Sequence, residues 1–594
     1  MLTFDVVIVL IVLIFILISL YKEILGASFT FVIAVVALGF FGILTPKEIL
    51  SGFANEQIFV IILLLLIGDI IRRTGVLEFF FDRIFQSARS ERSFMARMMV
   101  LIATFSAFLN NTPLVAIMMP YVNNWSKRNN ISPSKLLMPL SFAAILGGCA
   151  TLVGTSTNLI VSGMVADQDI VGRPMSLNIF DFSWVGVPMI ILGLGYLFLF
   201  SRKFLPEKTD AMDDFSKKSR EYLVEAQVRK NSPLIGKTIE EADLRNLKGL
   251  FLVEIIRKSN RFKAVSPDVI LQQDDVLIFA GDTHTIAEMI NSKSGLTLPS
   301  VGMMYKKKKT EVVEIVISQN SSLINKTVKE VRFRAKYDAA VIAVHRNGEK
   351  ISGKIGEIVI KPGDVLLLFT GEDFVNRTSH THDFYFISKV RDFRKIEGYK
   401  VATLFGGLFL AIILSAFNLV SLFMSLLVLL IAAFALNIAN PKDLPKAIDY
   451  NLALIIVLSL ALGIAMRKSG TAQILADFII SVFMPFGKVG LLFGIYLITA
   501  FLGAYIGNKA AVALIFPISL TMAANLGLPP MPFILVVSFA AAANFITPIG
   551  YQTNLMVYGP GGYSFKDFFR LGMPLTIIYM LVTITILSLM YFKV

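Results

Sequence analysis

The sequence predicts a polytopic α-helical membrane protein in which two related apolar parts flank a polar middle. Hydrophobic residues make up 55% of the 594 residues and charged residues 16%, and the mean hydropathy is +0.71. A soluble globular protein carries about 25% charged residues. Many of the apolar runs have the length that an α-helix needs to cross a bilayer. This composition excludes a soluble enzyme, a DNA-binding protein and a secreted disulfide scaffold, and the single cysteine, Cys149, allows no intrachain disulfide.

Apolar runs define ten expected spans. The first run begins at Phe4 and is read as a span because Asp5 and the absence of a basic segment argue against a signal peptide. Two further apolar stretches, 95–126 and 489–524, have polar residues at their centres and are expected to form re-entrant helical hairpins. The expected spans are 4–20, 27–44, 57–73, 137–166, 183–201, 399–418, 420–438, 451–467, 533–558 and 568–592.

The distribution of cationic residues predicts the orientation, because cytoplasmic loops are enriched in Lys and Arg. Such residues follow the third span and the exit of the first hairpin. We therefore expect a multi-pass protein of the cell membrane with a cytoplasmic middle part and both termini outside. The net charge of +14 fits such loops and does not require a nucleic-acid partner. The residues that set this orientation are Arg72, Arg73, Arg83, Arg89, Arg92, Arg97, Lys127, Arg128 and Lys135.

The two apolar parts, 1–203 and 398–594, repeat each other in register. The matched segments, which keep a nearly constant offset, are Asn111–Pro120 with Asn508–Pro517, Ser141–Ala144 with Ser538–Ala541, and Gly154–Val161 with Gly550–Val557. Each repeat has five expected spans, and this odd number places the second copy upside down in the membrane. Inverted repeats with interrupted helices are typical of secondary transporters that bind substrate near the midplane.

The polar middle is itself duplicated, as two α+β modules at 204–299 and 300–397. The segment Ser232–Thr238 of the first module matches Ser321–Thr327 of the second. Short apolar runs rich in Val and Ile predict strands, and short helices are expected at 240–244 and 328–333. The residues at 300–310, which include four consecutive lysines, are expected to form a solvated linker, with contact to anionic lipid headgroups as the alternative.

Polar residues interrupt the apolar segments at four places, two in each repeat. Free N–H groups at the start of a half-helix favour an anion, whereas carbonyl, Asn and Thr oxygens at a break favour a small hard cation. The alternative is that these small polar residues only allow close helix packing. The breaks are Asn110–Pro113, Gly154–Asn158, Gly507–Lys509 and Thr547–Asn554. The candidate substrate-binding residues are Asn110, Asn111, Thr112, Thr157, Asn508, Lys509, Thr553 and Asn554.

Lys509 distinguishes the second hairpin tip from the first, where Thr112 is its counterpart. An unpaired ammonium group at membrane depth is costly. Lys509 is therefore expected to bind the anion or to replace one coupled cation, unless it snorkels or pairs structurally.

The pattern resembles the divalent anion:sodium symporter family. That family has Ser-Asn-Thr at each hairpin tip, matched here by Asn110-Asn111-Thr112 and Gly507-Asn508-Lys509. Its Gly-Thr-x-x-Asn and Thr-Pro breaks are matched by Gly154–Asn158 and Thr547-Pro548. The two modules are similar to TrkA-C (RCK-C) regulatory domains, with Gly363-Asp364-Val365-Leu366 as the intact form of one motif.

This resemblance implies a homodimer, an elevator motion, sodium coupling and a divalent anion as substrate. Both tips lack the family's serine and one carries Lys509, so we expect one sodium site rather than two, or anion exchange. Sulfate is slightly favoured over di- or tricarboxylates, and the TrkA-C modules are expected to be regulatory, with an unidentified ligand. The residues onto which the sodium ligands map are Asn111, Gly154, Asn158, Asn508, Thr547 and Asn554.

Other classes fit the sequence less well. A potassium channel would need a selectivity-filter sequence, which is absent, and a sodium–proton antiporter would need acidic residues in the breaks. An enzyme is not expected, because the polar middle has neither a nucleophile–base set nor a Gly-rich nucleotide loop. A sensor that has lost transport stays open as an alternative.

Overall fold

The structure is a computed structural model of the 594-residue chain. The residues that it describes are 3–22, 24–74, 81, 84–85, 88, 90–166, 169–170, 173–174, 177–208, 223–244, 250–257, 260–263, 268–281, 296–297, 312–346, 349–351, 354–371, 373–378, 381–387, 398–417, 419–441 and 450–592. The linker expected at 300–310 and two of the cationic residues, Arg83 and Arg89, lie outside this part.

Helices dominate both apolar parts of the chain. The first part contains α1(Phe4–Tyr21), α2(Ala27–Phe40), α3(Pro46–Ser51), α4(Glu56–Thr74), α6(Glu91–Ser106), α7(Asn111–Arg128), α8(Leu137–Gly148), α9(Ser156–Ala166) and α10(Ser183–Phe204), with a two-stranded hairpin of β1(Asp169–Ile170) and β2(Arg173–Pro174). The second contains α16(Gly398–Ala416), α17(Leu422–Ala435), α19(Tyr450–Lys468), α20(Thr471–Phe483), α21(Gly487–Ile506), α22(Asn508–Asn525), α23(Pro530–Ala542), α24(Gln552–Tyr558) and α25(Phe565–Phe592).

The helix boundaries repeat with the sequence. The start of α6 at Glu91 corresponds to the start of α21 at Gly487, and the start of α7 at Asn111 corresponds to the start of α22 at Asn508. Each of the expected spans 137–166 and 533–558 is two helices with a break between them, as α8 and α9 or α23 and α24. The helix α20 was not expected from the sequence. Gly470, with a φ of +83°, separates it from α19.

The chain is a polytopic membrane protein. Within the described residues, five segments have the length and composition to cross a membrane, and further apolar helices are shorter. The five segments are Phe4–Tyr21, Ser183–Phe204, Gly398–Ala416, Thr471–Ile506 and Phe565–Phe592. The shorter helical segments are Ala27–Phe40, Ile58–Ile71, Ser156–Val165, Leu422–Ala435 and Pro530–Ala542. The ten-span topology stays a prediction.

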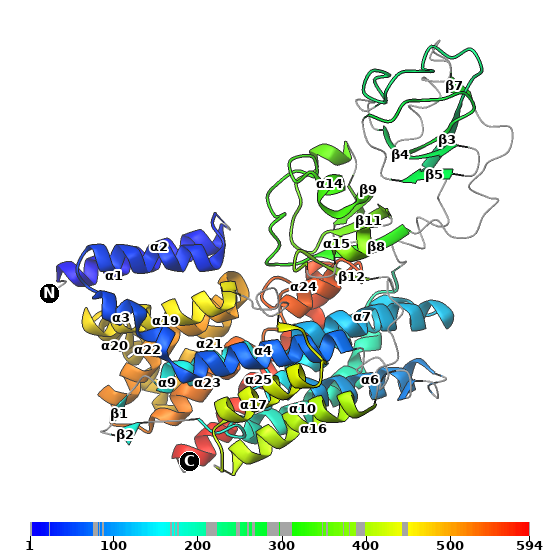
Figure 1. Ribbon diagram of the computed structural model, residues 1–594. Coiled ribbons are helices and arrows are strands. Elements are labelled where there is room, and N and C mark those ends of the chain that lie inside the picture. The colour runs from blue at the N-terminus through cyan, green and yellow to red at the C-terminus, as the bar shows by residue number, and fades with distance from the viewer. Residues whose placement is uncertain are drawn as a thin grey trace.

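Helices from the two apolar parts pack into one hydrophobic core. The first-part helix α8 packs on α6, α7, α10 and α24, and the second-part helix α22 packs on α19, α21, α23 and α9. Figure 1 shows the helices as one body, with the sheets at its upper right and both chain ends toward its left. Segments from the first and last thirds of the chain thus lie side by side, which brings the polar breaks of both repeats into the same interior.

Two five-stranded antiparallel sheets lie in the chain between the helical parts, and they share one topology. Their strand orders are β5-β4-β6-β3-β7 and β10-β9-β11-β8-β12. The first sheet is made of β3(Leu223–Val228), β4(Leu250–Arg257), β5(Asn260–Lys263), β6(Val276–Gly281) and β7(Leu296–Thr297). The second is made of β8(Val312–Ile317), β9(Ala339–Arg346), β10(Glu349–Lys350), β11(Val365–Thr370) and β12(Phe384–Phe386).

Side chains repeat across the sheets as well. The Arg257 guanidinium donates two hydrogen bonds of 2.8 Å to the buried Asp275 carboxylate, and Arg346 pairs in the same way with Asp364 at the equivalent positions of the second sheet. Charge-assisted bidentate pairs of this kind fix the orientation of a strand end. The duplication seen in the sequence is therefore also a duplication of structure.

The short helices expected in the modules differ from those observed. Residues 240–244 and 328–332 form turns, and the second module instead has the one-turn helix α14(Phe333–Tyr337). The backbone explains this, because Asp243, Arg332 and Asp338 have φ values of +53°, +50° and +52°, which stop a right-handed helix.

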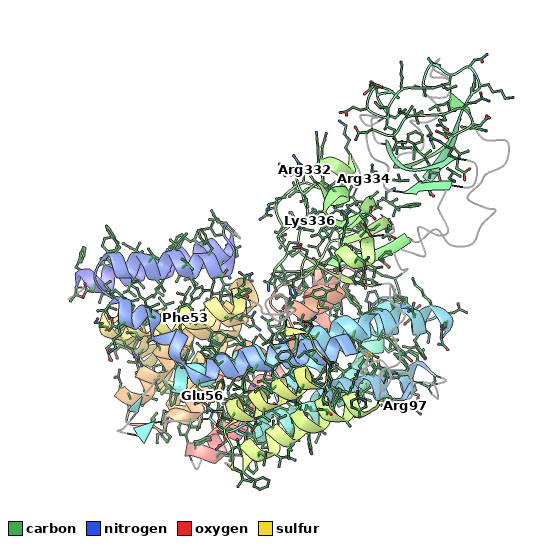
Figure 2. All side chains as sticks on the ribbon, viewed as in Figure 1. Phe53, Glu56, Arg97, Arg332, Arg334 and Lys336 are labelled. Carbon is green, nitrogen blue, oxygen red and sulfur yellow. The ribbon has the colours of Figure 1, made fainter. Side chains whose placement is uncertain are left out.

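A mixed hydrophobic cluster joins the two sheets. It includes Val253 and Ile278 from the first sheet and Ile342 and Leu367 from the second. Arg334 of α14 donates a 2.8 Å hydrogen bond to the Leu252 carbonyl of the first sheet. Figure 2 shows Arg334 on the side of the second sheet module that lies toward the first, with Arg332 and Lys336 farther from it.

Candidate functional site

The hairpin tips are short interruptions between antiparallel helices. In the first, α6 ends at Ser106 and α7 begins at Asn111, with the Asn110 side chain accepting a 3.3 Å hydrogen bond from the Thr112 N–H. In the second, α22 begins directly after Gly507, whose φ is +88° and which offers no side-chain cap. The first tip therefore has a capped helix start, whereas the second leaves N–H groups of α22 available.

Two reciprocal hydrogen bonds join the broken helices of the repeats. The Ser141 hydroxyl on α8 donates to Asn554 Oδ1 on α24 at 2.8 Å. The Ser538 hydroxyl on α23 donates to Asn158 Oδ1 on α9, also at 2.8 Å. All four side chains are fully buried. The serines occupy matched positions of the two repeats, and so do the asparagines, so the two hydrogen bonds are reciprocal.

Each of these asparagines also forms a hydrogen bond to the main chain at the helix break of its own repeat. Asn158 Nδ2 donates to the Thr151 carbonyl at 2.8 Å, and Asn554 Nδ2 donates to the Thr547 carbonyl at 3.2 Å. These carbonyls lie where the helical hydrogen bonding stops, so each amide satisfies a main-chain group that the break has freed.

Thr151 and Thr547 each form a hydrogen bond between a helix break and a hairpin tip. The Thr151 hydroxyl donates to the Ala107 carbonyl, and the Thr547 hydroxyl donates to the Ala504 carbonyl at 3.3 Å. Ala107 and Ala504 occupy equivalent positions, at the ends of the first arms of the two hairpins. In both repeats, therefore, one threonine couples the position of the broken helix to the position of the tip.

A hydroxyl cluster lies at the first tip. The Ser106 hydroxyl lies within hydrogen-bonding distance of two acceptors, Asn111 Oδ1 and, at 2.7 Å, the Ala144 carbonyl. Asn111 Nδ2 donates to the Tyr551 hydroxyl at 2.7 Å, and Tyr551 also lies 2.9 Å from the Thr155 hydroxyl. Tyr551 comes from the second repeat, so the first tip is completed by the second broken helix.

Gln552 extends this connection to the second sheet. The Thr112 hydroxyl donates to Gln552 Oε1 at 3.3 Å, and Gln552 Nε2 donates to the Tyr385 hydroxyl of β12 at 2.8 Å. Gln319, just after β8, donates a 3.3 Å hydrogen bond to the Ile549 carbonyl in the break before α24. The second sheet module therefore contacts the second break directly.

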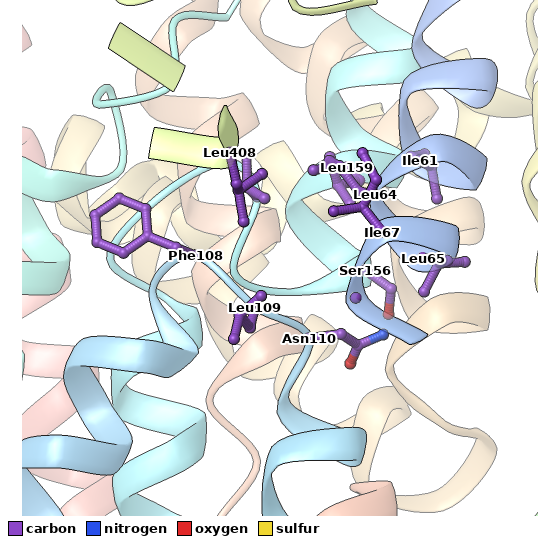
Figure 3. Close-up of a pocket in the computed structure, with 12 residues that line it drawn as sticks. Ile61, Leu64, Leu65, Ile67, Phe108, Leu109, Asn110, Ser156, Leu159 and Leu408 are labelled. Atoms are coloured by element: carbon purple, nitrogen blue, oxygen red, sulfur yellow. The ribbon is translucent and has the colours of Figure 1, made fainter. Parts of the chain in front are cut away.

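A pocket opens beside the first tip. Its volume is about 420 Å³, including the open mouth, and its lining is apolar except for Asn110 and Ser156. Figure 3 shows Asn110 low in the view, Leu64 of α4 and Leu159 of α9 above it, Leu408 of α16 at the upper left, and Ser156 beside Leu65 of α4. The pocket thus lies where the first tip and α9 meet the helices α4 and α16.

The candidate residues lie at different depths. Thr157, Asn158, Thr553 and Asn554 are fully buried. Asn111 is also buried, while Asn110, Thr112, Asn508 and Lys509 are partly exposed. Asn110 is the one predicted residue that lines the pocket described above. Their roles toward substrate and sodium stay predictions.

Sequence reasoning missed Ser106, Ser141, Ser538 and Tyr551. Ser141 and Ser538 stood in a matched pair of segments, and this repetition was a usable signal. Tyr551 replaces Thr155 in the repeat, and its reach into the other half could not be read from local sequence.

Comparison with known proteins places the chain in a family. A family model described as citrate transporter matches residues 8–425 and 408–594. The chain belongs to the citrate transporter family. Its family and its relatives are transporters, so the protein is a membrane transporter and not an enzyme.

Three relatives match this chain over most of its length and most of their own. A Chlamydomonas reinhardtii protein, provisionally named a sulfur deprivation response regulator, is 35% identical over 93% of this chain and 96% of its own length. A protein of Synechocystis sp., named an uncharacterized transporter, is 32% identical over 98% of this chain and 96% of its own length. The sodium/sulfate cotransporter 1 of Chlamydomonas reinhardtii is 25% identical over 94% of this chain and 86% of its own length.

Proposed function

We propose that the protein is a secondary active transporter of a divalent oxyanion, with sulfate as the first candidate and sodium as the coupled ion. The observation that carries this proposal is the reciprocal Ser141–Asn554 and Ser538–Asn158 pairing, which holds two matching breaks in one buried centre. Broken helices at such a centre are how secondary transporters build ion and anion sites. Sulfate is taken from the names of relatives, including sodium/sulfate cotransporter 1.

The reciprocal hydrogen bonds also support two inverted repeats. With an odd number of spans per repeat, the second copy enters the membrane with opposite polarity. In this arrangement the sheets are cytoplasmic and both termini lie outside. Figure 1 shows the two termini well away from the sheets, in line with this arrangement. An elevator motion would carry the tips and the broken helices past α4 and α16, and the pocket lies where these groups meet. The homodimer implied by the family resemblance stays a prediction.

The oxygen atoms near the first tip fit a sodium ion, which would travel as a co-substrate. A methyl group placed on Gly154 would lie 2.5 Å from the Gly148 carbonyl oxygen and 2.8 Å from that of Ser106. The Ser106 hydroxyl and Asn111 Oδ1 are in direct contact nearby. Main-chain and side-chain oxygens are the ligands that a hard cation prefers, and glycine at 154 leaves room for them to converge.

Uptake of radiolabelled sulfate into proteoliposomes tests this function. We expect saturable uptake that an inward sodium gradient stimulates and that choline in place of sodium reduces. Unchanged uptake in choline would remove sodium coupling and leave exchange, which preloading the vesicles with unlabelled sulfate would reveal. In a sodium-coupled protein, Lys509→Thr is expected to steepen the sodium dependence if the lysine replaces a second ion.

A di- or tricarboxylate is the second candidate substrate, because the family model is described as citrate transporter. Competition distinguishes the two. Excess succinate or citrate should leave sulfate uptake unchanged if sulfate is the substrate. Strong inhibition, together with uptake of the labelled carboxylate, would favour the carboxylate function.

The sheet modules, which resemble TrkA-C domains, are proposed to restrain transport. The second module binds the main chain at Ile549 and the side chain of Gln552, on either side of the start of α24. A methyl group on Gly559 would lie 2.4 Å from the Gly363 carbonyl oxygen, so the surfaces are closely apposed. A motion of α24 relative to the module must break these contacts. Deleting residues 205–395 is expected to change the uptake rate, and equal rates would exclude this role.

A further inference from the structure

The two hairpin tips differ by an exchange of polar and small residues. In the first repeat, Ser106 donates to Asn111 Oδ1, and a methyl group on Gly148 would lie 2.6 Å from the amide atoms of Asn111. At the equivalent positions of the second repeat, Ser106 becomes Gly503 and Gly148 becomes Asn544. Compared with the first tip, the second tip therefore lacks a serine, at Gly503, and has an additional side-chain amide, at Asn544.

Asn544 and the start of α22 both border Gly503. A methyl group placed on Gly503 would lie 3.8 Å from Asn544 Nδ2 and 3.9 Å from the Cα atom of Asn508, the first residue of the helix. A methyl group on Gly550 would lie only 2.2 Å from the same nitrogen. Gly503 and Gly550 therefore make room for the Asn544 amide between the second tip and the second break.

The Asn544 amide is a buried donor that the protein does not use. The residue is 5% exposed, and its Nδ2 atom has no hydrogen-bond partner among the described residues. Buried polar groups in native proteins are nearly always paired, so an orphan of this kind needs an explanation such as a ligand. Gly503 borders both this donor and the uncapped start of the 18-residue helix α22, where the partial positive charge of the helix favours an anion.

The two tips therefore offer opposite chemistry. The first tip gathers oxygen atoms from Ser106, Asn111, Thr155 and Tyr551. The second offers main-chain N–H groups and the Asn544 amide. Oxygen atoms attract a cation, whereas converging N–H groups attract an oxyanion.

We propose that Asn544 is a specificity-determining substrate ligand, whose amide N–H groups bind an oxygen of the transported oxyanion at the start of α22. This inference rests on the proposed transport function and adds to it a division of labour, in which the first repeat holds the coupled cation and the second holds the anion. The Asn544 amide occupies the space into which a serine at position 503 would point. In this proposal the second tip therefore lacks the serine oxygen that a second cation would need, and the amide takes the place of that cation.

Kinetics of Asn544 variants in proteoliposomes test this assignment. Asn544→Ala is expected to raise KM for sulfate about tenfold, since a hydrogen bond to a charged group is lost. Asn544→Asp is expected to raise it further, because a carboxylate repels the anion. The sodium concentration for half-maximal uptake should stay within twofold of wild type in both. Asn129→Ala, at the exposed end of α7, is the matched control and should leave KM unchanged.

Three results would overturn the inference. A wild-type KM in Asn544→Ala would show that the amide does not touch the substrate. A lower maximal rate with unchanged KM would show a structural role. Retained sulfate affinity in Asn544→Asp with altered sodium dependence would show that the side chain binds the cation through its oxygen. If the wild-type protein transports neither sulfate nor a carboxylate, the proposed function fails first, and this outcome is separate from the other three.

A swap variant covers the possibility that single substitutions do not fold. Gly503→Ser with Asn544→Gly copies the arrangement of the first repeat into the second. A Cβ atom at position 503 would have its neighbours at ordinary van der Waals distance, and Asn544→Gly removes the amide that a serine hydroxyl there would meet. We expect weaker sulfate binding together with a steeper dependence on sodium. An unchanged sulfate KM in this variant would also contradict the assignment.

Discussion

The hydroxyl of Ser141 lies 2.8 Å from the side-chain oxygen of Asn554, and its counterpart Ser538 lies at the same distance from Asn158. Each repeat thus supplies a serine from the helix before its break and an asparagine from the helix after it. Each asparagine also donates back to a carbonyl of its own break. Because of this pairing, the conformation of the chain at each helix break is stabilised by a side chain of the other repeat.

Removing either serine hydroxyl should have nearly the same effect. Ser141→Ala and Ser538→Ala each delete one buried hydrogen bond to an asparagine, which is worth about 1 kcal/mol. Asn554→Ala should cost more, because the carbonyls of Asn544 and Thr547 lose their donor too. Denaturation by SDS, followed through the fluorescence of Trp125 and Trp184, measures the free energy of unfolding.

The exposed Ser481→Ala on α20 is the control for this comparison and should leave the free energy unchanged. Losses that differ by more than about 1 kcal/mol between the two serine variants would contradict an equivalent role in the two repeats.

Much of this arrangement was readable from the repeat, but not all of it. The nearly constant offset between the two copies identified the tips and the breaks, because the same polar residues interrupt the apolar pattern twice. The hydrogen bonds between the two repeats could not be predicted, since a sequence repeat does not show whether a side chain contacts its own repeat or the other one. Tyr551 shows this, because it departs from its counterpart Thr155 and completes the opposite tip.

The fold was predicted less well where single backbone angles decide the structure. The sequence Arg467–Gly470 resembled a loop between a span and a hairpin, yet α20 starts immediately after the positive φ of Gly470. The turn at 240–244 contains apolar and acidic residues typical of a helix, and the positive φ of Asp243 stops it. Such angles depend on tertiary contacts that local propensity does not include.

Tyr551→Phe should weaken cation coupling. The change removes the hydroxyl that accepts from Asn111 and lies beside Thr155, while the ring keeps its packing. With that partner gone, the Asn111 amide is free to rotate, and its oxygen no longer faces the Ser106 hydroxyl. We expect the sodium concentration for half-maximal sulfate uptake to rise about fivefold to thirtyfold, which corresponds to about 1–2 kcal/mol.

Tyr558→Phe, at the other end of α24 from Tyr551 and outside this network, is the matched control and should keep wild-type sodium dependence. A shift of similar size in both variants would show that the effect comes from general loosening of α24.

Tyr385→Phe should release the second module from the transport machinery. The lost hydrogen bond joins β12 to Gln552, which also contacts Thr112 at the first tip. Because the hydrogen bond is only partly buried, its loss should lower the free-energy barrier to transport by about 1 kcal/mol. We expect uptake about threefold to tenfold faster at saturating sulfate, with KM unchanged.

The exposed Tyr399→Phe, near the start of α16, is the matched control for this variant. Slower uptake in Tyr385→Phe would mean that the module supports transport rather than restraining it, and an unchanged rate in that variant would contradict any coupling through this bond.

Acid should loosen the second module through Asp383. Burial raises the pKa of this carboxyl, but hydrogen bonds from the Tyr337 hydroxyl and the Ser322 N–H, with Lys336 nearby, outweigh burial and lower the pKa to about 2. Because the folded pKa is below the unfolded value of about 3.9, this stabilisation is complete above about pH 4 and is lost as the pH falls toward 2. Pepsin cleavage of residues 312–387 in the full-length protein should accelerate over that range relative to Asp383→Asn, whose module carries no such carboxylate. Parallel pH profiles for the two proteins would show that Asp383 does not contribute.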